Sequence, residues 1–110
     1  MNRLAMSSAA AALFRALLQR GNVQRDRILL TEYLSVDWQS LTFVGERHEF
    51  RFRVPGPEAG AIVAALTRNL ESDEFTLPGQ VLADIVVAPP PLEGADGSIS
   101  FGIEALTIQD

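Results

Sequence analysis

Residues 47–54, with the sequence RHEFRFRV, alternate between polar and apolar side chains along their whole length. The polar side carries Arg47, Glu49, Arg51 and Arg53, and the apolar side carries His48, Phe50, Phe52 and Val54. A repeat of two residues is the period of a β-strand that buries one face and exposes the other. The chain must therefore build a sheet with one apolar face, and the sequence's only histidine belongs to that face.

The segment before this strand, residues 28–44, is rich in apolar and β-branched residues, which favours a hairpin. Gly45 stands at the first position of the turn VGER, as a type II′ turn requires. In the resulting register Phe43 lies opposite His48, and apolar side chains meet apolar ones as far as residue 41. The match extends further only if one residue is added at Gln39–Ser40, where we expect a β-bulge.

Beyond that bulge, Trp38 and Leu34 would join the buried face, with Trp38 opposite Phe52. Asp37 would lie opposite Arg53, and Glu49 stands within the arginine stripe, so acids largely neutralise the stripe. Proteins that bind single-stranded nucleic acid also expose aromatic side chains for base stacking, which this face lacks apart from one tyrosine. We therefore expect no nucleic-acid partner.

The rest of the chain divides into two helical segments and two strands. Residues 8–20 and 57–72 repeat their apolar side chains at helical spacing. Residues 80–88 form an apolar strand that only Asp84 interrupts, which predicts a central strand covered on both faces. Residues 98–109 form the last strand.

Two local features join these segments. Pro78 and Gly79 within LPGQ predict a type II turn before the apolar strand. In the last strand, the apolar side chains change sides near Glu104–Ala105, which predicts a second β-bulge. The segment 89–97 between the two strands is predicted to be a loop.

The predicted order of elements is α-β-β-α-β-β, without internal repeats. A chain of 110 residues that is 47% hydrophobic can build one core, so we expect a single α+β domain over residues 1–110. The expected architecture is a two-layer α/β sandwich, with a four-stranded, mainly antiparallel sheet and both helices on one face.

Charge is distributed unevenly along the chain. Residues 1–57 hold eight arginines against five acids, which gives +3, and residues 58–110 hold one arginine against nine acids, which gives −8. The two parts can attract each other within one chain or between chains. Because two short helices cover one face of the sheet, the leftover face could be buried in a homodimer.

Several chemistries are excluded by residues that the sequence lacks. A P-loop, a Schiff base and a kinase site each need a lysine, and this chain has none. With no cysteine and one histidine, a structural zinc site cannot form, and we expect no metal and no other cofactor. No nucleophile stands with a base in a known motif, so we assign no catalytic residue and lean against an enzyme.

The first 21 residues combine a positive charge with a short apolar stretch, as signal peptides do. Arg15 interrupts that stretch, and no apolar run reaches the roughly 18 residues of a membrane span. We therefore expect a cytoplasmic protein with no membrane association. The exclusive use of arginine as the basic residue, with abundant alanine, indicates a GC-rich genome, and we expect a bacterial source.

Two functions remain open after these exclusions. The first is an interaction or assembly module that forms a homodimer, since no catalytic constellation is present. The alternative is a small-ligand-binding protein or minor enzyme with a pocket between helix and sheet near Trp38, His48 and Asp84. In that alternative, Arg51 or Arg53 would bind an anionic group of the ligand.

Overall fold

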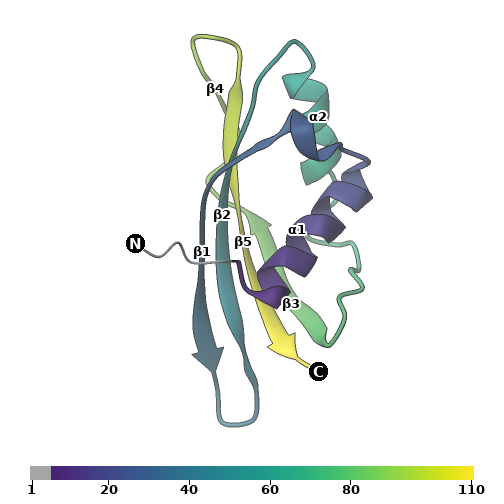
Figure 1. The fold of residues 1–110 in the computed structure, drawn as a ribbon, viewed down its shortest axis with the longest axis vertical. Helices are drawn as coiled ribbons and strands as arrows, with labels where there is room; N and C mark the ends of the chain where they lie inside the picture. The colour runs from purple at the N-terminus through teal and green to yellow at the C-terminus, as the bar shows by residue number, and fades with distance from the viewer. Residues whose placement is uncertain (1–5) are drawn as a thin grey trace.

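The computed structural model describes residues 6–110, and Figure 1 shows both helices on the same side of the sheet. In chain order the elements are α1 (Ser8–Gly21), the 3₁₀ turn η1 (Arg25–Arg27), β1 (Leu29–Gln39), β2 (Val44–Val54), α2 (Ala59–Thr67), β3 (Gln80–Val87), β4 (Leu92–Glu93) and β5 (Ile99–Gln109). The predicted α+β class, with two helices and an antiparallel sheet, is confirmed. Residues 1–5, which begin the stretch considered as a signal peptide, lie outside the described residues.

The sheet has five strands rather than the predicted four. Its order is β1-β2-β5-β3, and the two-residue strand β4 pairs with the start of β5. Strand β4 falls inside segment 89–97, which the sequence predicted to be a loop because of its prolines and glycines. The prediction that residues 80–88 form a central strand is wrong, because β3 lies at an edge of the sheet.

Helix α1 begins and ends close to the predicted residues. The hydroxyl of Ser7 accepts a hydrogen bond from the backbone N–H of Ala10 at 3.0 Å, which caps the first turn. At the other end, Asn22 adopts the left-handed conformation with φ 53° and caps the helix. The sequence predicted this role for the preceding residue, Gly21. Leu13, Phe14 and Leu17 form the buried side of this helix.

Helix α2 is shorter than the predicted 57–72. Its backbone leaves the helical conformation at Arg68, where φ is −62° and ψ is 125°. The guanidinium of Arg20 in α1 donates to the carbonyl oxygens of Leu66 and Arg68. This contact satisfies carbonyls at the helix end that would otherwise lack a partner. Apolar spacing alone predicted a longer helix, and in the structure the end of α2 coincides with this contact from α1.

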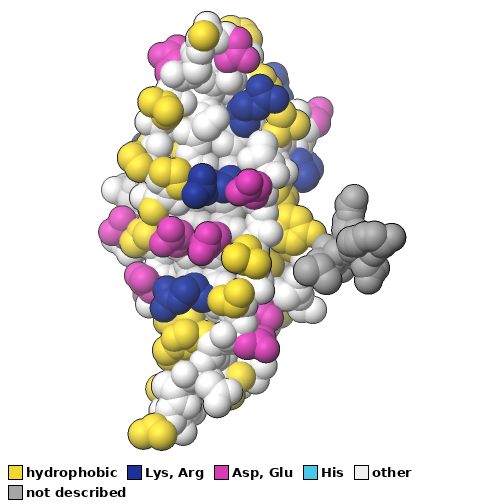
Figure 2. Space-filling model, turned by 90° about the vertical axis from the view of Figure 1, so that its left-hand side faces the viewer, with side chains coloured by type: hydrophobic (Ala, Val, Ile, Leu, Met, Phe, Trp, Pro, Cys, Tyr) yellow, Lys and Arg dark blue, Asp and Glu magenta, His cyan; other side chains and the backbone are white. Residues whose placement is uncertain are grey.

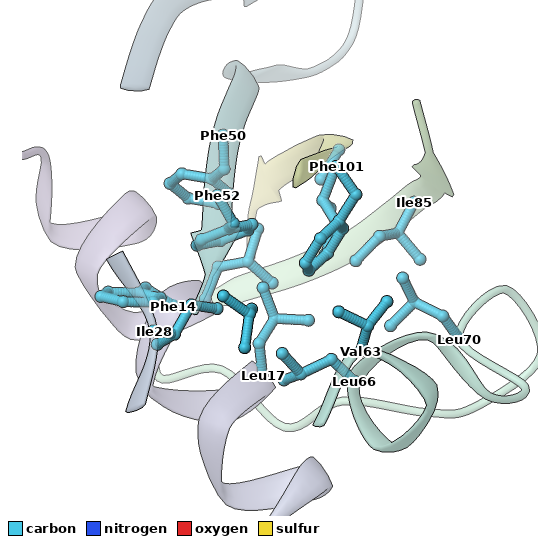
Figure 3. Packing of buried hydrophobic residues seen from close by; sticks show 14 of the residues in the cluster. Phe14, Leu17, Ile28, Phe50, Phe52, Val63, Leu66, Leu70, Ile85 and Phe101 are labelled. Atoms are coloured by element: carbon cyan, nitrogen blue, oxygen red, sulfur yellow. The ribbon is translucent and has the colours of Figure 1, made fainter. Parts of the chain in front are cut away.

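The core lies between the helices and the sheet (Figure 3). Phe14 of α1 stacks on Phe52 with 5.8 Å between ring centroids, and Phe52 packs against Phe101 at 5.2 Å. Val63 and Leu66 bring α2 to the same cluster. The opposite face of the sheet, which we call the open face, carries no helix among the described residues (Figure 1).

The hairpin turns at Ser40–Phe43, so the predicted turn at Gly45 is wrong. The hydroxyl of Ser40 accepts from the backbone N–H of Phe43 at 3.1 Å, which supplies a local turn. Gly45 instead lies in β2, where an added Cβ would stand 1.9 Å from the carbonyl oxygen of Thr107. Gly45 is needed because it permits the close approach of two strands, whereas sequence reasoning attributed the glycine to a turn.

The irregularities of the sheet also differ from the two predicted bulges. In β1 the register shifts between Leu30 and Glu32, and residues 32–39 then pair without interruption. The predicted bulge at Gln39–Ser40 is therefore wrong, since it followed from the misplaced turn. In β5 no shift occurs against β2; the irregularity lies in the partner strand β3, between Leu82 and Asp84. The extra residue in β3 moves Asp84 to the open face, while Leu82 and Ile85 both face the helices.

The opposite charges of the two parts of the chain meet within one molecule. Three ion pairs each join an arginine of residues 1–57 to an acid of residues 58–110. They are Arg20–Asp73 at 2.6 Å, Arg27–Glu58 at 2.9 Å and Arg53–Asp96 at 3.9 Å. Arginine and carboxylate are at least partly exposed in every pair, so each contributes little to stability by itself.

The LPGQ turn is confirmed by Gly79, whose φ is 71°.

Candidate interaction surface

The structure does not bring Trp38, His48 and Asp84 together. His48 pairs with Ser35 on the helix-covered face and is fully buried. Trp38 lies three residues beyond Ser35 in a regular strand, so its side chain takes the open face. Asp84 is on the open face too, but it belongs to β3 at the other edge of the sheet. The pocket expected at these three residues does not form, because the misplaced turn put Trp38 on the wrong face.

His48 joins three strands through hydrogen bonds. Its Nδ1 lies 2.7 Å from the hydroxyl of Ser35 in β1, and its Nε2 lies 2.8 Å from the hydroxyl of Thr107 in β5. The ring lies parallel to that of Phe50, with 6.2 Å between centroids. A neutral imidazole offers one donor and one acceptor, and hydroxyl groups can complement both. Every polar atom of the ring is therefore satisfied, which is how a buried histidine supports a sheet.

Burial lowers the pKa of His48, because desolvation disfavours the charged imidazolium. The carboxylate of Glu46, 3.9 Å from Nε2, opposes this shift but does not reverse it. Glu46 in turn accepts a hydrogen bond of 2.6 Å from the hydroxyl of Ser7, the residue that caps α1. Glu46 thus connects the sheet to the start of a helix, and the fully buried histidine is inaccessible to a ligand.

Arg51 and Arg53 are the two candidate residues that the structure places at one site. Both line a groove of about 360 Å³ that also contains Glu32 and Leu92. The remaining lining residues are Thr31, Phe52, Pro89, Pro90, Ser100 and Phe101. Arg53 lies 3.9 Å from Asp96, whereas no ion pair within residues 6–110 includes Arg51. The groove therefore offers a guanidinium that makes no ion pair among the described residues, although Glu32 lies opposite it in β1, beside apolar walls.

Figure 2 looks onto the open face and shows charged side chains interspersed with apolar ones. Glu49 pairs directly with Glu104 of β5, so two carboxylates lie side by side at the middle of the sheet. Arg47 and Arg51 occupy the adjacent positions on the same face of β2. Like charges in direct opposition destabilise a sheet, and the flanking arginines offset that repulsion. The self-neutralised polar side that the sequence predicted for residues 47–53 thus lies on the open face.

The exposed apolar side chains gather instead along β1 and at the hairpin turn. On the open face of β1, Leu34 is 52% exposed and Val36 is 46% exposed. At the turn, Leu41 is completely exposed and Phe43 is 53% exposed. Strand β1 is a terminal strand of the sheet, so this apolar row lies along an edge. We call Leu34, Val36 and Trp38 the β1 row.

Sequence reasoning missed the β1 row because it assigned Trp38 and Leu34 to the buried face. The signal that could have found the row is Ser40, a residue whose hydroxyl favours turns through bonds to nearby backbone groups. A turn at residues 40–43 aligns Tyr33 with Phe50 and moves the β1 row to the other side. The glycine-based turn looked better because glycine is the usual residue of two-residue hairpin turns.

The part of the chain that the structure describes contains neither a helix that could span a membrane nor a cluster of metal-binding side chains. Within residues 6–110, no helix has both the length and the apolar character that crossing a membrane requires. Over the same residues, no group of three or more His, Cys, Asp or Glu side chains is arranged to hold a metal ion.

Comparisons with known proteins give little guidance. No protein-family model matches the chain, and no curated protein matches it in sequence. Among solved structures, the chain is similar to the type 4 fimbrial biogenesis protein PilO from Pseudomonas aeruginosa. The identity is 11% and the TM-score 0.47, over 93% of this chain and 69% of that chain. A likeness of this degree does not assign a function to the present chain.

Proposed function

We propose that this protein is an interaction module that assembles into a homodimer through the β1 side of its sheet. The observation that supports this most directly is the β1 row, a line of apolar side chains on a terminal strand in which Leu34 and Val36 are exposed and Trp38 is half-buried. Terminal strands present unpaired backbone donors and acceptors, which makes them natural sites of strand addition. An exposed apolar line beside such an edge favours association, because its burial removes apolar surface from water.

The exposed residues at the hairpin turn extend the same surface. Leu41 and Phe43 continue the apolar character of β1 beyond the end of the strand. Large apolar side chains that are grouped in this way mark interaction sites more often than scattered ones do. The charged middle of the open face would have to be desolvated in a face-to-face dimer. Association at the edge leaves those charges in water.

Size-exclusion chromatography with light scattering tests the proposal. At micromolar concentration, the expected mass is twice the 12.0 kDa of one chain. A monomer under these conditions contradicts the proposal. Dilution should convert the dimer to monomer in a concentration-dependent way, which distinguishes a specific equilibrium from aggregation.

A second candidate function is the binding of a small anionic ligand in the groove at Arg51 and Arg53. The supporting observation is the guanidinium of Arg51, which has no ion-pair partner in the described residues and lies beside apolar walls. A ligand at 100 times its dissociation constant would add about 2.7 kcal/mol to stability. A thermal-shift screen of phosphorylated and carboxylated metabolites checks this, with Arg51→Ala as the variant that should lose the shift.

A further inference from the structure

The backbone of β1 has two sides that can be told apart. Ser40 donates a hydrogen bond to the carbonyl of Phe43 at 2.9 Å, so this pair faces inward across the hairpin. Inward and outward residues alternate along an antiparallel ladder. The backbone groups of Leu34, Val36 and Trp38 therefore point toward β2.

The backbone groups of Ser35, Asp37 and Gln39 consequently point away from β2, toward the free side of the strand. Pairing at the other side of the sheet supports the same alternation. Gly102 exchanges hydrogen bonds of 2.9 Å with Ala88 and Pro89, so even-numbered residues of β5 bond toward β3. Odd-numbered residues of β5 then bond to β2, and the ladder from β2 to β1 follows in phase.

A second copy of β1 could add to this edge in several antiparallel registers, and the side chains discriminate among them. If Asp37 lay at the two-fold axis, two aspartates would oppose each other. With the axis at Ser35, Glu32 would face Trp38 of the second copy, and with the axis at Leu34 it would face Val36. Each of these registers sets a carboxylate against a carboxylate or against an apolar side chain.

The register centred on Val36 has neither fault. Val36 then faces Val36 of the second copy, and Leu34 faces Trp38 twice. On the other side of the strand, Ser35 faces Asp37, so a hydroxyl meets a carboxylate. The apolar pairs fall at positions without direct hydrogen bonds, where the side chains of antiparallel neighbours approach most closely. The β1 row is thus complementary to itself in this register alone among those four.

We propose that two copies of this chain pair β1 with β1 in antiparallel fashion about a two-fold axis at Val36, so that their sheets become continuous. This inference rests on the proposed function and specifies its interface. A two-fold axis satisfies both copies with the same surface, which closes the assembly at a dimer. The β1 row, exposed in one copy, becomes a continuous apolar seam on the open face of the joined sheet.

Cysteine cross-linking tests the register in the full chain, which has no cysteine of its own. Val36→Cys would place two cysteines opposite each other across the axis with their Cα atoms about 4.5 Å apart, within the range that a disulfide spans. Under mild oxidation this variant should form a covalent dimer. The matched control is Val81→Cys on the edge strand β3, where the side chain is 50% exposed and should stay unlinked.

A proline substitution tests the backbone pairing independently. Asp37→Pro removes an N–H that points to the second copy while leaving the ladder to β2 intact. The dissociation constant should rise at least about tenfold, equivalent to 1.4 kcal/mol. An unchanged far-UV circular dichroism spectrum and a cooperative unfolding transition would show that the variant still folds.

The outcomes separate the inference from the proposed function. A monomeric wild-type protein overturns both. A wild-type dimer in which Val36→Cys links no faster than Val81→Cys overturns the register and leaves dimerisation to another surface. A linked Val36→Cys dimer together with weakened association of Asp37→Pro supports the edge-to-edge interface.

Discussion

The two edges of the sheet are built differently. Strand β1 runs for 11 residues without a proline, and its irregularity lies near its start. At the other edge, β3 is bulged between Leu82 and Asp84, and the chain then continues through Pro89 and Pro90 to the short strand β4. Bulges, prolines and short strands are devices that keep an edge from pairing with another molecule.

The bulge and the prolines make the β3 edge, which we call the protected edge, a poor partner for a second strand, whereas the β1 edge is left available. Gly102 of β5 lets the chain beyond β3 continue along the sheet, because Ala88 and Pro89 pack directly on its backbone. Strand β1 has no proline and is held from within by the hydrogen bonds of His48. The two edges therefore differ in their capacity to pair with a second strand, which is the arrangement that a closed dimer requires.

The largest expected effect comes from breaking the protected edge. A Cβ at Gly102 would lie 2.4 Å from the carbonyl oxygen of Ala88 and 2.6 Å from Cδ of Pro89. Gly102→Ala should therefore reduce the free energy of unfolding by about 2–3 kcal/mol, measured by urea denaturation. Gly60→Ala in α2 is the control, since its Cβ meets no atom within 4 Å and should add about 0.5–1 kcal/mol. Equal effects of both substitutions would show that the packing on Gly102 does not constrain this edge.

Next in size is the loss of the histidine that holds β1 in place. His48→Leu leaves the hydroxyl of Thr107 buried without its partner, which should cost about 1–3 kcal/mol of unfolding free energy at pH 7.5. Adding Thr107→Val removes the unpaired hydroxyl. The double variant should therefore lose less unfolding free energy than the sum of the losses of the two single variants. Additive losses in this cycle would mean that the two side chains do not interact.

The same histidine makes the β1 side sensitive to pH. Burial lowers the pKa of His48, so the folded protein holds neutral imidazole while the unfolded chain titrates near its usual value of about 6.5. Below that pH the unfolded chain binds more protons, and stability must fall as the pH decreases toward the lower folded pKa. The stability gap between wild type and His48→Leu should narrow from pH 7.5 to pH 5.5 in urea titrations. A constant gap would contradict the neutral state of the ring.

Introducing one positive charge on each edge tests which of the two edges takes part in association. Val36→Lys puts two ammonium groups against each other at the proposed axis and should raise the dissociation constant of the dimer at least about tenfold, or 1.4 kcal/mol. Val81→Lys introduces the same charge on β3 and should leave the constant unchanged. Light scattering over a concentration series measures both, and weakening by Val81→Lys alone would place the interface at β3.

The smallest effect is expected at the loop beside the protected edge. Asp96 accepts hydrogen bonds from the hydroxyl and backbone N–H of Ser98, at 2.7 and 3.0 Å, and these bonds lower the pKa of its carboxyl group. That contribution is present at neutral pH and disappears as the pH falls through the lowered pKa. Asp96→Asn should decrease the melting temperature slightly at pH 7, by less than His48→Leu. A larger decrease would show that this loop is more than a solvent-exposed turn.

Much of the secondary structure follows from the sequence, because periodicity depends on neighbours a few residues apart. The alternation from Arg47 to Val54 identified β2 and its buried face, and that face carries Phe50 and Phe52 in the core. The hairpin register did not follow, since two possible turns four residues apart, at 40–43 and 44–47, competed. Gly45 looked like a turn residue, yet it serves contact with β5, a strand more than fifty residues away.

The candidate site was less accessible to prediction, because faces of a sheet are decided by register. One misplaced turn transferred Leu34 and Trp38 to the wrong face and hid the row that we propose for association. Arg51 and Arg53 lie on the polar side of β2, as the unambiguous alternation of that strand predicted. The sequence showed that Asp84 interrupts an apolar strand, but only the register shift between Leu82 and Asp84 places its side chain on the open face.

The sequence by itself determined the α+β class, the approximate positions of both helices and of the four long strands, and the buried face of β2. These depend on local spacing and on which side chains avoid water. Tertiary structure decided the strand order, the places of the bulges and the end of α2, because each requires contact between residues distant in the chain. It also decided the irregular form of the β3 edge, since the shift between Leu82 and Asp84 and the packing of Ala88 and Pro89 on Gly102 both depend on pairing with β5.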